Sequence, residues 1–118
     1  ACVFYSTTGH SVGGNSCNGP YSCYDSYTSI GHNSCQGNRA CYFMDDAFVS
    51  NNACNGDDAC SYKKDSVGAS SCNGARACES NSGFISRFSC VGIEACQYNE
   101  QSVGRNQCVG DYICDALP

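Results

Sequence analysis

The sequence has few of the large apolar residues that build an ordinary protein core. Leucine, isoleucine, valine and phenylalanine together make up 17 of the 118 residues. That share is about 14%, below the level of roughly 20% under which chains usually stay unfolded. Burial of so few large side chains does not offset the loss of chain entropy on folding. The composition therefore excludes a cytosolic enzyme built on a two-layer hydrophobic core.

Long apolar runs and basic residues are also scarce. No stretch approaches the roughly 18 apolar residues that a membrane-spanning helix needs, so we predict no membrane span. Six lysines and arginines stand against eleven aspartates and glutamates, which gives a formal net charge of -5. Because nucleic-acid binding depends on basic residues that contact phosphates, this balance predicts no nucleic-acid partner.

Sequence patterns that carry catalysis are missing as well. The chain contains no G-x-S-x-G, H-E-x-x-H, P-loop or G-x-G-x-x-G pattern, and no calcium-binding nonapeptide. The adjacent acidic residues Asp45 and Asp46, and likewise Asp57 and Asp58, are interpreted as solvated turn residues rather than a carboxylate pair for glycoside hydrolysis. We therefore predict that the protein is not an enzyme and has neither catalytic residues nor a cofactor.

Cysteine, in contrast, is present in excess. The chain has 13 cysteines, above the level of about 8–10% that marks a disulfide scaffold in a short chain. Disulfides persist in oxidising compartments, so we predict a secreted, extracellular protein. The chain opens at Ala1 without the basic and apolar segments of a signal peptide. We interpret it as a mature form or as a piece of a longer secreted protein.

The cysteines form a tandem repeat. From position 17 onward they occur in six pairs with a constant spacing of six residues: Cys17/Cys23, Cys35/Cys41, Cys54/Cys60, Cys72/Cys78, Cys90/Cys96 and Cys108/Cys114. The first cysteines of successive pairs lie 18, 19, 18, 18 and 18 residues apart. The period is therefore 18, with one residue inserted between Cys41 and Cys54.

Other positions follow the same period and indicate the fold. Glycine stands two positions after each first cysteine, and valine or isoleucine stands five positions before it. Eighteen residues are too few for the packed helices of a helical repeat. They suit one coil of a β-solenoid, in which two or three short strands are joined by glycine turns and an aliphatic column points inward.

We therefore predict an all-β fold, a disulfide-laced β-solenoid (β-helix) of about six 18-residue coils. Residues 1–118 are expected to form a single domain, with 1–16 as a partial leading coil. The coils are predicted to start near Cys17, Cys35, Cys54, Cys72, Cys90 and Cys108.

A column of charged residues offers an independent indication of stacking. The residues four positions after the first cysteines are Tyr21, Arg39, Asp58, Arg76, Glu94 and Tyr112. In parallel stacking these side chains are vertical neighbours, and neighbours of opposite charge attract each other. We predict a stacking charge ladder of Arg39, Asp58, Arg76 and Glu94, which sets the register more than the stability because exposed pairs contribute less than about 1 kcal/mol each.

Two disulfide pairings fit the repeat. Pairing within each C-x5-C unit leaves Cys2 over, as an unpaired or intermolecular cysteine, whereas pairing each second cysteine with the next first cysteine leaves Cys114 over. We favour the first scheme because the spacing within the unit never varies. The C-x5-C spacing differs from that of structural zinc sites, and His10 and His32 fall in different columns, so no metal site is predicted.

The consensus S-V-G-x-N-S-C-N-G-x-x-A-C resembles tandem cysteine-rich repeats in uncharacterised secreted proteins of microalgae and bacteria. That resemblance covers nearly the whole chain and implies no particular activity. The cysteine spacing is also similar to that of disulfide-bridged insect antifreeze solenoids, which bind ice through ranks of threonine. Here Thr7, Thr8 and Thr28 form no column, which argues against ice binding.

These observations favour a structural function. The open strand edges of an uncapped solenoid can pair with another chain, and an end-to-end contact that does not close makes a filament. We expect an extracellular structural repeat protein that self-associates end to end as a building block of a filament, or that belongs to a longer solenoid array. The alternative is a surface-binding module that presents a flat face to ice or to a glycan.

A sugar-stacking surface would need aromatic residues that share columns. The aromatic residues weighed for this role share columns only in part, so scattered packing is the expected arrangement: Tyr5, Phe43, Tyr62, Phe84, Phe88 and Tyr98.

Overall fold

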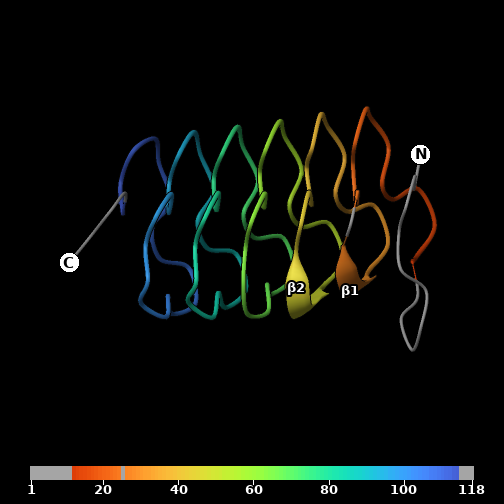
Figure 1. Cartoon of the computed structure of the whole chain (residues 1–118). Helices are drawn as coiled ribbons and strands as arrows, with labels where there is room; N and C mark the ends of the chain where they lie inside the picture. The colour runs from red at the N-terminus through yellow and green to blue at the C-terminus, as the bar shows by residue number, and fades with distance from the viewer. Residues whose placement is uncertain (1–11, 25, 115–118) are drawn as a thin grey trace.

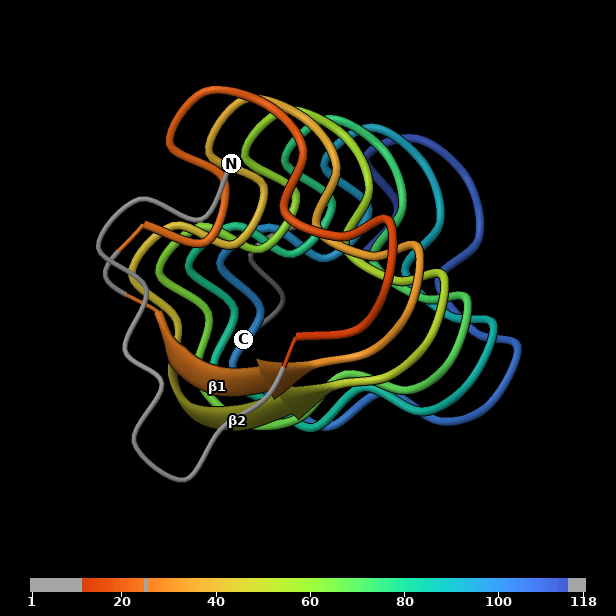
Figure 2. The ribbon, with the colours of Figure 1, turned by 90° about the vertical axis from the view of Figure 1, so that its right-hand side faces the viewer.

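The chain winds into a stack of similar coils. The computed structural model describes residues 12–24 and 26–114, and its principal extents are 34 × 22 × 19 Å. The coils follow one another along a single axis (Figure 1) and superimpose when viewed near this axis (Figure 2). The described residues contain no helix, and thus none long and apolar enough to cross a membrane. The prediction of a non-helical, disulfide-rich fold is confirmed.

Two strands pair in parallel in neighbouring coils. Strand β1 spans Tyr27–Ile30 and strand β2 spans Asp45–Val49. Tyr27 pairs with Asp45, an offset of 18, whereas Ser29 pairs with Phe48, an offset of 19. The residue inserted into this repeat is therefore absorbed in β2 as a bulge, where one strand has an extra residue opposite its partner.

The valine and isoleucine column continues this pairing through the whole stack. Each member forms a parallel bridge with the next: Val12, Ile30, Val49, Val67, Ile85 and Val103. From Ile30 to Val103 these side chains are at most 5% exposed. The expected inward aliphatic column is confirmed, and it forms the core together with the cysteines and the alanines beside them.

The coils contain less strand than expected. The sequence predicted two or three strands per coil, but the described residues contain only β1 and β2, plus isolated bridges. The reason is backbone geometry: among the described residues, 24 that are not glycine have positive φ, a conformation that is uncommon outside glycine. Around each first cysteine, residues with positive φ, one of them a glycine, alternate with other residues, as at Asn52, Cys54, Gly56 and Asp58. This alternation interrupts both an extended strand and a right-handed helix.

Backbone hydrogen bonds nevertheless join each coil to the next. The amide of Gly56 donates to the carbonyl of Gln36 at 2.7 Å, and the amide of Cys54 donates to the carbonyl of Ser71 at 3.0 Å. The equivalent glycine and cysteine bonds recur along the stack. Because the coils bond in both directions along the axis, the stack is held by a parallel network even where no regular strand forms.

Candidate functional site

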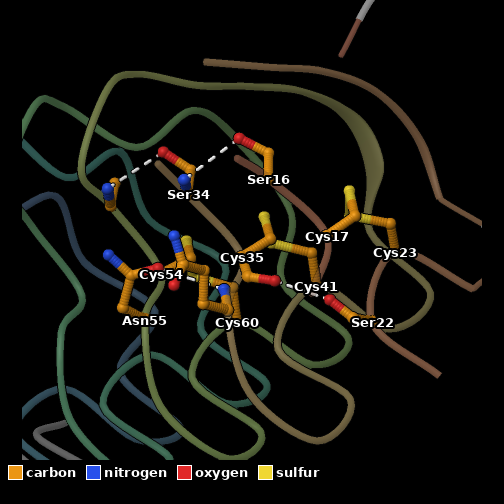
Figure 3. Close-up of a disulfide and its surroundings, with 12 residues drawn as sticks. Ser16, Cys17, Ser22, Cys23, Ser34, Cys35, Cys41, Cys54, Asn55 and Cys60 are labelled. Atoms are coloured by element: carbon orange, nitrogen blue, oxygen red, sulfur yellow. Dashed lines mark hydrogen bonds between the residues drawn. A yellow bond between two sulfur atoms is a disulfide. The ribbon is translucent and has the colours of Figure 1, made fainter. Parts of the chain in front are cut away.

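The six disulfides lie one above another inside the stack. Each joins the two cysteines of one C-x5-C unit, with Cα atoms 5.4–5.6 Å apart. Figure 3 shows three successive bridges, each crossing its own coil. The cysteines from Cys17 to Cys96 are fully buried. Of the two predicted disulfide schemes, the structure has the one that pairs the cysteines within each C-x5-C unit. Cys2 lies outside the described residues.

Stacking of the bridges also brings sulfur atoms of different coils together. Among the described residues, three groups of three cysteines have sulfur atoms within 4.8 Å of one another: Cys23, Cys35 and Cys41; Cys54, Cys60 and Cys72; and Cys96, Cys108 and Cys114. Metals bind cysteine as the thiolate. Every one of these sulfurs is in a disulfide, so the groups reflect packing of neighbouring bridges.

Serine hydroxyls form a second buried connection between coils. Ser34 Oγ donates to the carbonyl of Ser50 at 2.8 Å and accepts from the amide of Ala53 at 3.1 Å. Ser89 Oγ bonds the following coil in the same way, to Gly104 and Gln107. The serine is part of the sequence consensus, but its role as a connector becomes evident only once the coils are stacked.

The charged column forms two ion pairs. Arg39 Nε lies 3.0 Å from Asp58 Oδ1, and Arg76 Nη2 lies 2.5 Å from Glu94 Oε2. The hydrogen bond and the charge of Glu94 raise the pKa of Arg76 above its ordinary value. Within the described part of the chain, Asp58 and Arg76 form no ion pair with each other. The column is therefore two separate vertical pairs, each joining two coils.

Five aromatic side chains gather on the first three coils. This aromatic patch consists of Tyr21, Tyr24, Tyr42, Phe43 and Tyr62. The rings of Tyr24 and Tyr42 are stacked with centroids 5.4 Å apart, and those of Phe43 and Tyr62 are stacked at 5.6 Å. Tyr42 and Phe43 meet edge to face at 4.4 Å. The sequence-based expectation of scattered aromatics is wrong for this patch.

The patch escaped the sequence analysis because its members occupy three columns rather than one. Tyr21 stands four positions after a first cysteine, Tyr24 and Tyr42 stand seven after, and Phe43 and Tyr62 stand eight after. Positive φ at Tyr21, Phe43 and Tyr62 turns the chain between these positions. The backbone turn therefore brings the three columns together on one surface.

A buried lysine occupies the interior of the third coil. Lys63 is fully buried, and its Nζ donates to the carbonyls of Lys64 and Gly83, both at 2.6 Å, and to Asn81 Oδ1 at 3.2 Å. Burial lowers the pKa of Lys63 to about 7, and the negative charge of Asp65 opposes this effect. Lys63 belongs to a column of buried residues nine positions after the first cysteines, whose members within the described residues are Ser26, Met44, Lys63, Asn81 and Asn99.

Comparison with known proteins identifies one family. Residues 1–75 and residues 52–117 each match the family described as "Domain of unknown function (DUF7640)". The two matches overlap over 52–75, which supports a tandem repeat because the same pattern can align in more than one place. No curated protein and no solved structure matches the chain. Since the matches together extend over almost all of the sequence, the chain belongs to the family described as a domain of unknown function, DUF7640.

Proposed function

We propose that the protein is an extracellular structural protein and that its coils form a rigid β-solenoid. The observation that carries this proposal is the coil itself, which repeats with one bridge and the same bonds to its neighbour each time. Each coil contacts only the adjacent coils, as in solenoid proteins. We expect such a stack to be rigid, because a disulfide fixes one loop of each coil and backbone hydrogen bonds join each coil to the next.

Secretion is part of the same proposal. A high content of disulfides is typical of extracellular proteins, since oxidising compartments keep the bridges intact. In a reducing compartment, cellular thiols would keep these cysteines reduced. The interior contains few large apolar side chains that would hold the coils together after reduction.

Extension of the stack completes the proposal. Inside the stack, the glycine two positions after each first cysteine touches the backbone of the next coil, as Gly56 touches Gly74. Gly110 keeps the same left-handed conformation, with a φ of 133°, in the last described coil. This conformation supports docking of a further coil, either from a second copy in a filament or from a longer array.

Electron microscopy and light scattering of the purified protein test the proposal. We expect rods or filaments whose length increases with protein concentration. A strictly monomeric species at all concentrations would contradict assembly by this chain. The β-solenoid itself is tested by hydrogen exchange, which we expect to be slowest at the amides that bond neighbouring coils, such as those of Cys54 and Gly56.

A second candidate function is a surface-binding module, and the aromatic patch favours it. Tyr21 and Tyr62 are 58% and 54% exposed, although tyrosine rings are usually buried in large part. Exposed rings suit a glycan better than ice, because the antifreeze solenoids that the spacing resembles use threonine. Glycan-array and thermal-hysteresis measurements separate the two ligands, and blank results in both would remove this candidate.

A further inference from the structure

We infer that Asn18 is a site of spontaneous deamidation, whereas stacking of the coils protects Asn55 and Asn73 from the same reaction. Each of these three asparagines stands between a first cysteine and a glycine. Deamidation is fastest where glycine follows asparagine, because the glycine backbone carries no hindering side chain and reaches unusual conformations easily. Such a modification site is separate from the proposed structural function and does not depend on it.

The reaction joins the asparagine side chain to the backbone of the following glycine. At Asn18, the backbone nitrogen of Gly19 loses its proton and attacks Cγ of the side chain. A C–N bond forms, the C–N bond of the side-chain amide breaks, and ammonia leaves. Water then opens the five-membered succinimide at either carbonyl, which yields aspartate or isoaspartate. Because no oxidant is consumed, the rate depends on how readily the glycine amide and the asparagine side chain can reach each other.

At Asn55, hydrogen bonds to the preceding coil hold both reacting groups. The amide of Gly56 donates to the carbonyl of Gln36 at 2.7 Å. In the side chain, Asn55 Oδ1 accepts from the amide of Gln36 at 3.0 Å, and Asn55 Nδ2 donates to the carbonyl of Asn33 at 3.1 Å. The glycine nitrogen can therefore attack the side chain only after these three bonds have opened.

The same three bonds recur one coil later, at Asn73. The amide of Gly74 donates to the carbonyl of Asn55 at 2.7 Å. Asn73 Oδ1 accepts from the amide of Asn55, and Asn73 Nδ2 donates to the carbonyl of Asn52, both at 3.0 Å. Protection is therefore a property of the stacked repeat, because two coils provide it in the same way.

Asn18 lacks these bonds. Its side chain is exposed, whereas Asn55 and Asn73 are only partly exposed. Within residues 12–24 and 26–114, neither the side chain of Asn18 nor the amide of Gly19 has a hydrogen-bond partner. The carbonyl of Asn18 accepts from the amide of Gly37 at 2.8 Å, but Asn55 and Asn73 have the equivalent carbonyl bond. The three sites therefore differ in the three bonds that hold the reacting groups.

This difference sets the size of the expected effect. One hydrogen bond shifts an opening equilibrium by roughly 2- to 12-fold, so three bonds together slow deamidation by at least about tenfold. We therefore expect Asn18 to react at least about tenfold faster than Asn55 and Asn73 in the folded, bridged chain. The two protected asparagines serve as controls within the same molecule, with the same neighbours in the sequence.

Peptide mapping by mass spectrometry tests the inference. The bridged chain is incubated at mildly alkaline pH, and the conversion of each amide to an acid is followed over time. A sample that is reduced and unfolded beforehand provides the reference, in which we expect similar rates at Asn18, Asn55 and Asn73. Asn18→Gln introduces the residue that the second coil has at Gln36. We expect this variant to lose the fast reaction, because the longer side chain does not form the five-membered ring readily.

Gln36→Asn is the matched control variant, since it places a further asparagine before a glycine inside the stack. We expect this new asparagine to react as slowly as Asn55, because the amide of Gly37 donates to the carbonyl of Asn18. Similar rates at Asn18, Asn55 and Asn73 in the bridged chain would overturn the inference. It would also be wrong if Asn18 stays intact while the unfolded reference reacts, or if Asn18→Gln retains the fast reaction at another residue.

Discussion

Inside the stack, the glycine two positions after each first cysteine has a backbone conformation and a close neighbour that no other residue fits. Gly56 has a φ of 128°, and a Cβ atom added there would lie 2.7 Å from the carbonyl carbon of Gly74 in the next coil. Glycine is the only residue that adopts such a φ without strain. Glycine is therefore required for two reasons: the coil itself needs a positive φ at this position, and the backbone of the neighbouring coil leaves no room for a Cβ atom.

These two requirements can be separated by mutation. Gly110 has a φ of 133°, but among the described residues the nearest atom to its added Cβ is Ile113 Cδ1 at 3.5 Å. We expect Gly110→Ala to lower the free energy of unfolding by about 1–3 kcal/mol through backbone strain alone. Gly56→Ala should cost distinctly more, because the neighbouring backbone must also move. Thermal unfolding without reductant measures both, and equal losses would contradict the close contact between coils.

Lys63 makes the stability of the protein depend on pH. Burial lowers its pKa to about 7 in the folded chain, against 10.5 for an ordinary lysine. Between these values the unfolded state binds more protons than the folded state, so the free energy of unfolding rises as the pH rises. Below pH 7 the Lys63 amine is protonated in both the folded and the unfolded chain, so the free energy of unfolding no longer changes with pH through this group.

We expect the free energy of unfolding to rise by on the order of 2 kcal/mol from pH 7 to pH 9. Lys63→Met places in the third coil the residue that the second coil has at Met44, and it should remove this rise. The matched control is Lys64→Met, since Lys64 is exposed and should leave the rise unchanged. Denaturant unfolding at both pH values provides the measurement. The prediction fails if Lys63→Met retains the full pH dependence.

At the level of the coil, the structure has one irregular repeat. The extra residue of the second repeat is taken up between Asp45 and Phe48, where the offset to β1 changes from 18 to 19. The paired cysteines keep a sequence separation of six in every repeat. The coil therefore tolerates a change of length in β2, whereas each bridge fixes the length of its own loop.

Deletion of single residues tests this difference. Removing Ala47 restores an 18-residue repeat, and we expect a melting temperature within about 5 °C of the unchanged chain. Removing Ala75 shortens the loop between Cys72 and Cys78 and should prevent that bridge from forming in its present geometry. Peptide mapping without reductant and thermal unfolding measure the two outcomes. A large loss of stability on removal of Ala47 would indicate that the bulge is essential.

The sequence predicts the coils better than their internal structure. The period of 18, the inward Val/Ile column and the absence of helix follow from spacing alone, since residues 18 apart become neighbours in a stack. The left-handed backbone at Cys54 or Arg76 could not be predicted, because cysteine and arginine have no particular preference for positive φ. That geometry reduces the strand content and also joins separate columns into the aromatic patch. The interior position of Lys63 was missed because its column mixes serine, methionine, lysine and asparagine.

At the level of the whole molecule, the last described coil differs from those inside the stack. Position 113 holds isoleucine, where four earlier coils have alanine and the first described coil has Ser22. The alanines are fully buried, whereas Ile113 is 51% exposed. Its Cδ1 atom lies near the point above Gly110 where, inside the stack, the backbone of the next coil is found. The larger side chain therefore restricts access to the face on which a further coil would dock.

If end-to-end stacking is the mode of assembly, a smaller side chain at this position should strengthen it. We expect Ile113→Ala to shift association to lower protein concentration, by at least about tenfold, because the exposed glycine can then approach another backbone closely. Ile93→Ala is the matched control, since Ile93 is 39% exposed but belongs to a coil inside the stack. Sedimentation velocity over a concentration series distinguishes the variants. The opposite result, in which Ile113→Ala associates no more than the unchanged chain but Ile93→Ala alters association, would contradict end-to-end stacking. Only the side surface of the stack would then respond to a change of exposed apolar area, so the chains would associate through their sides.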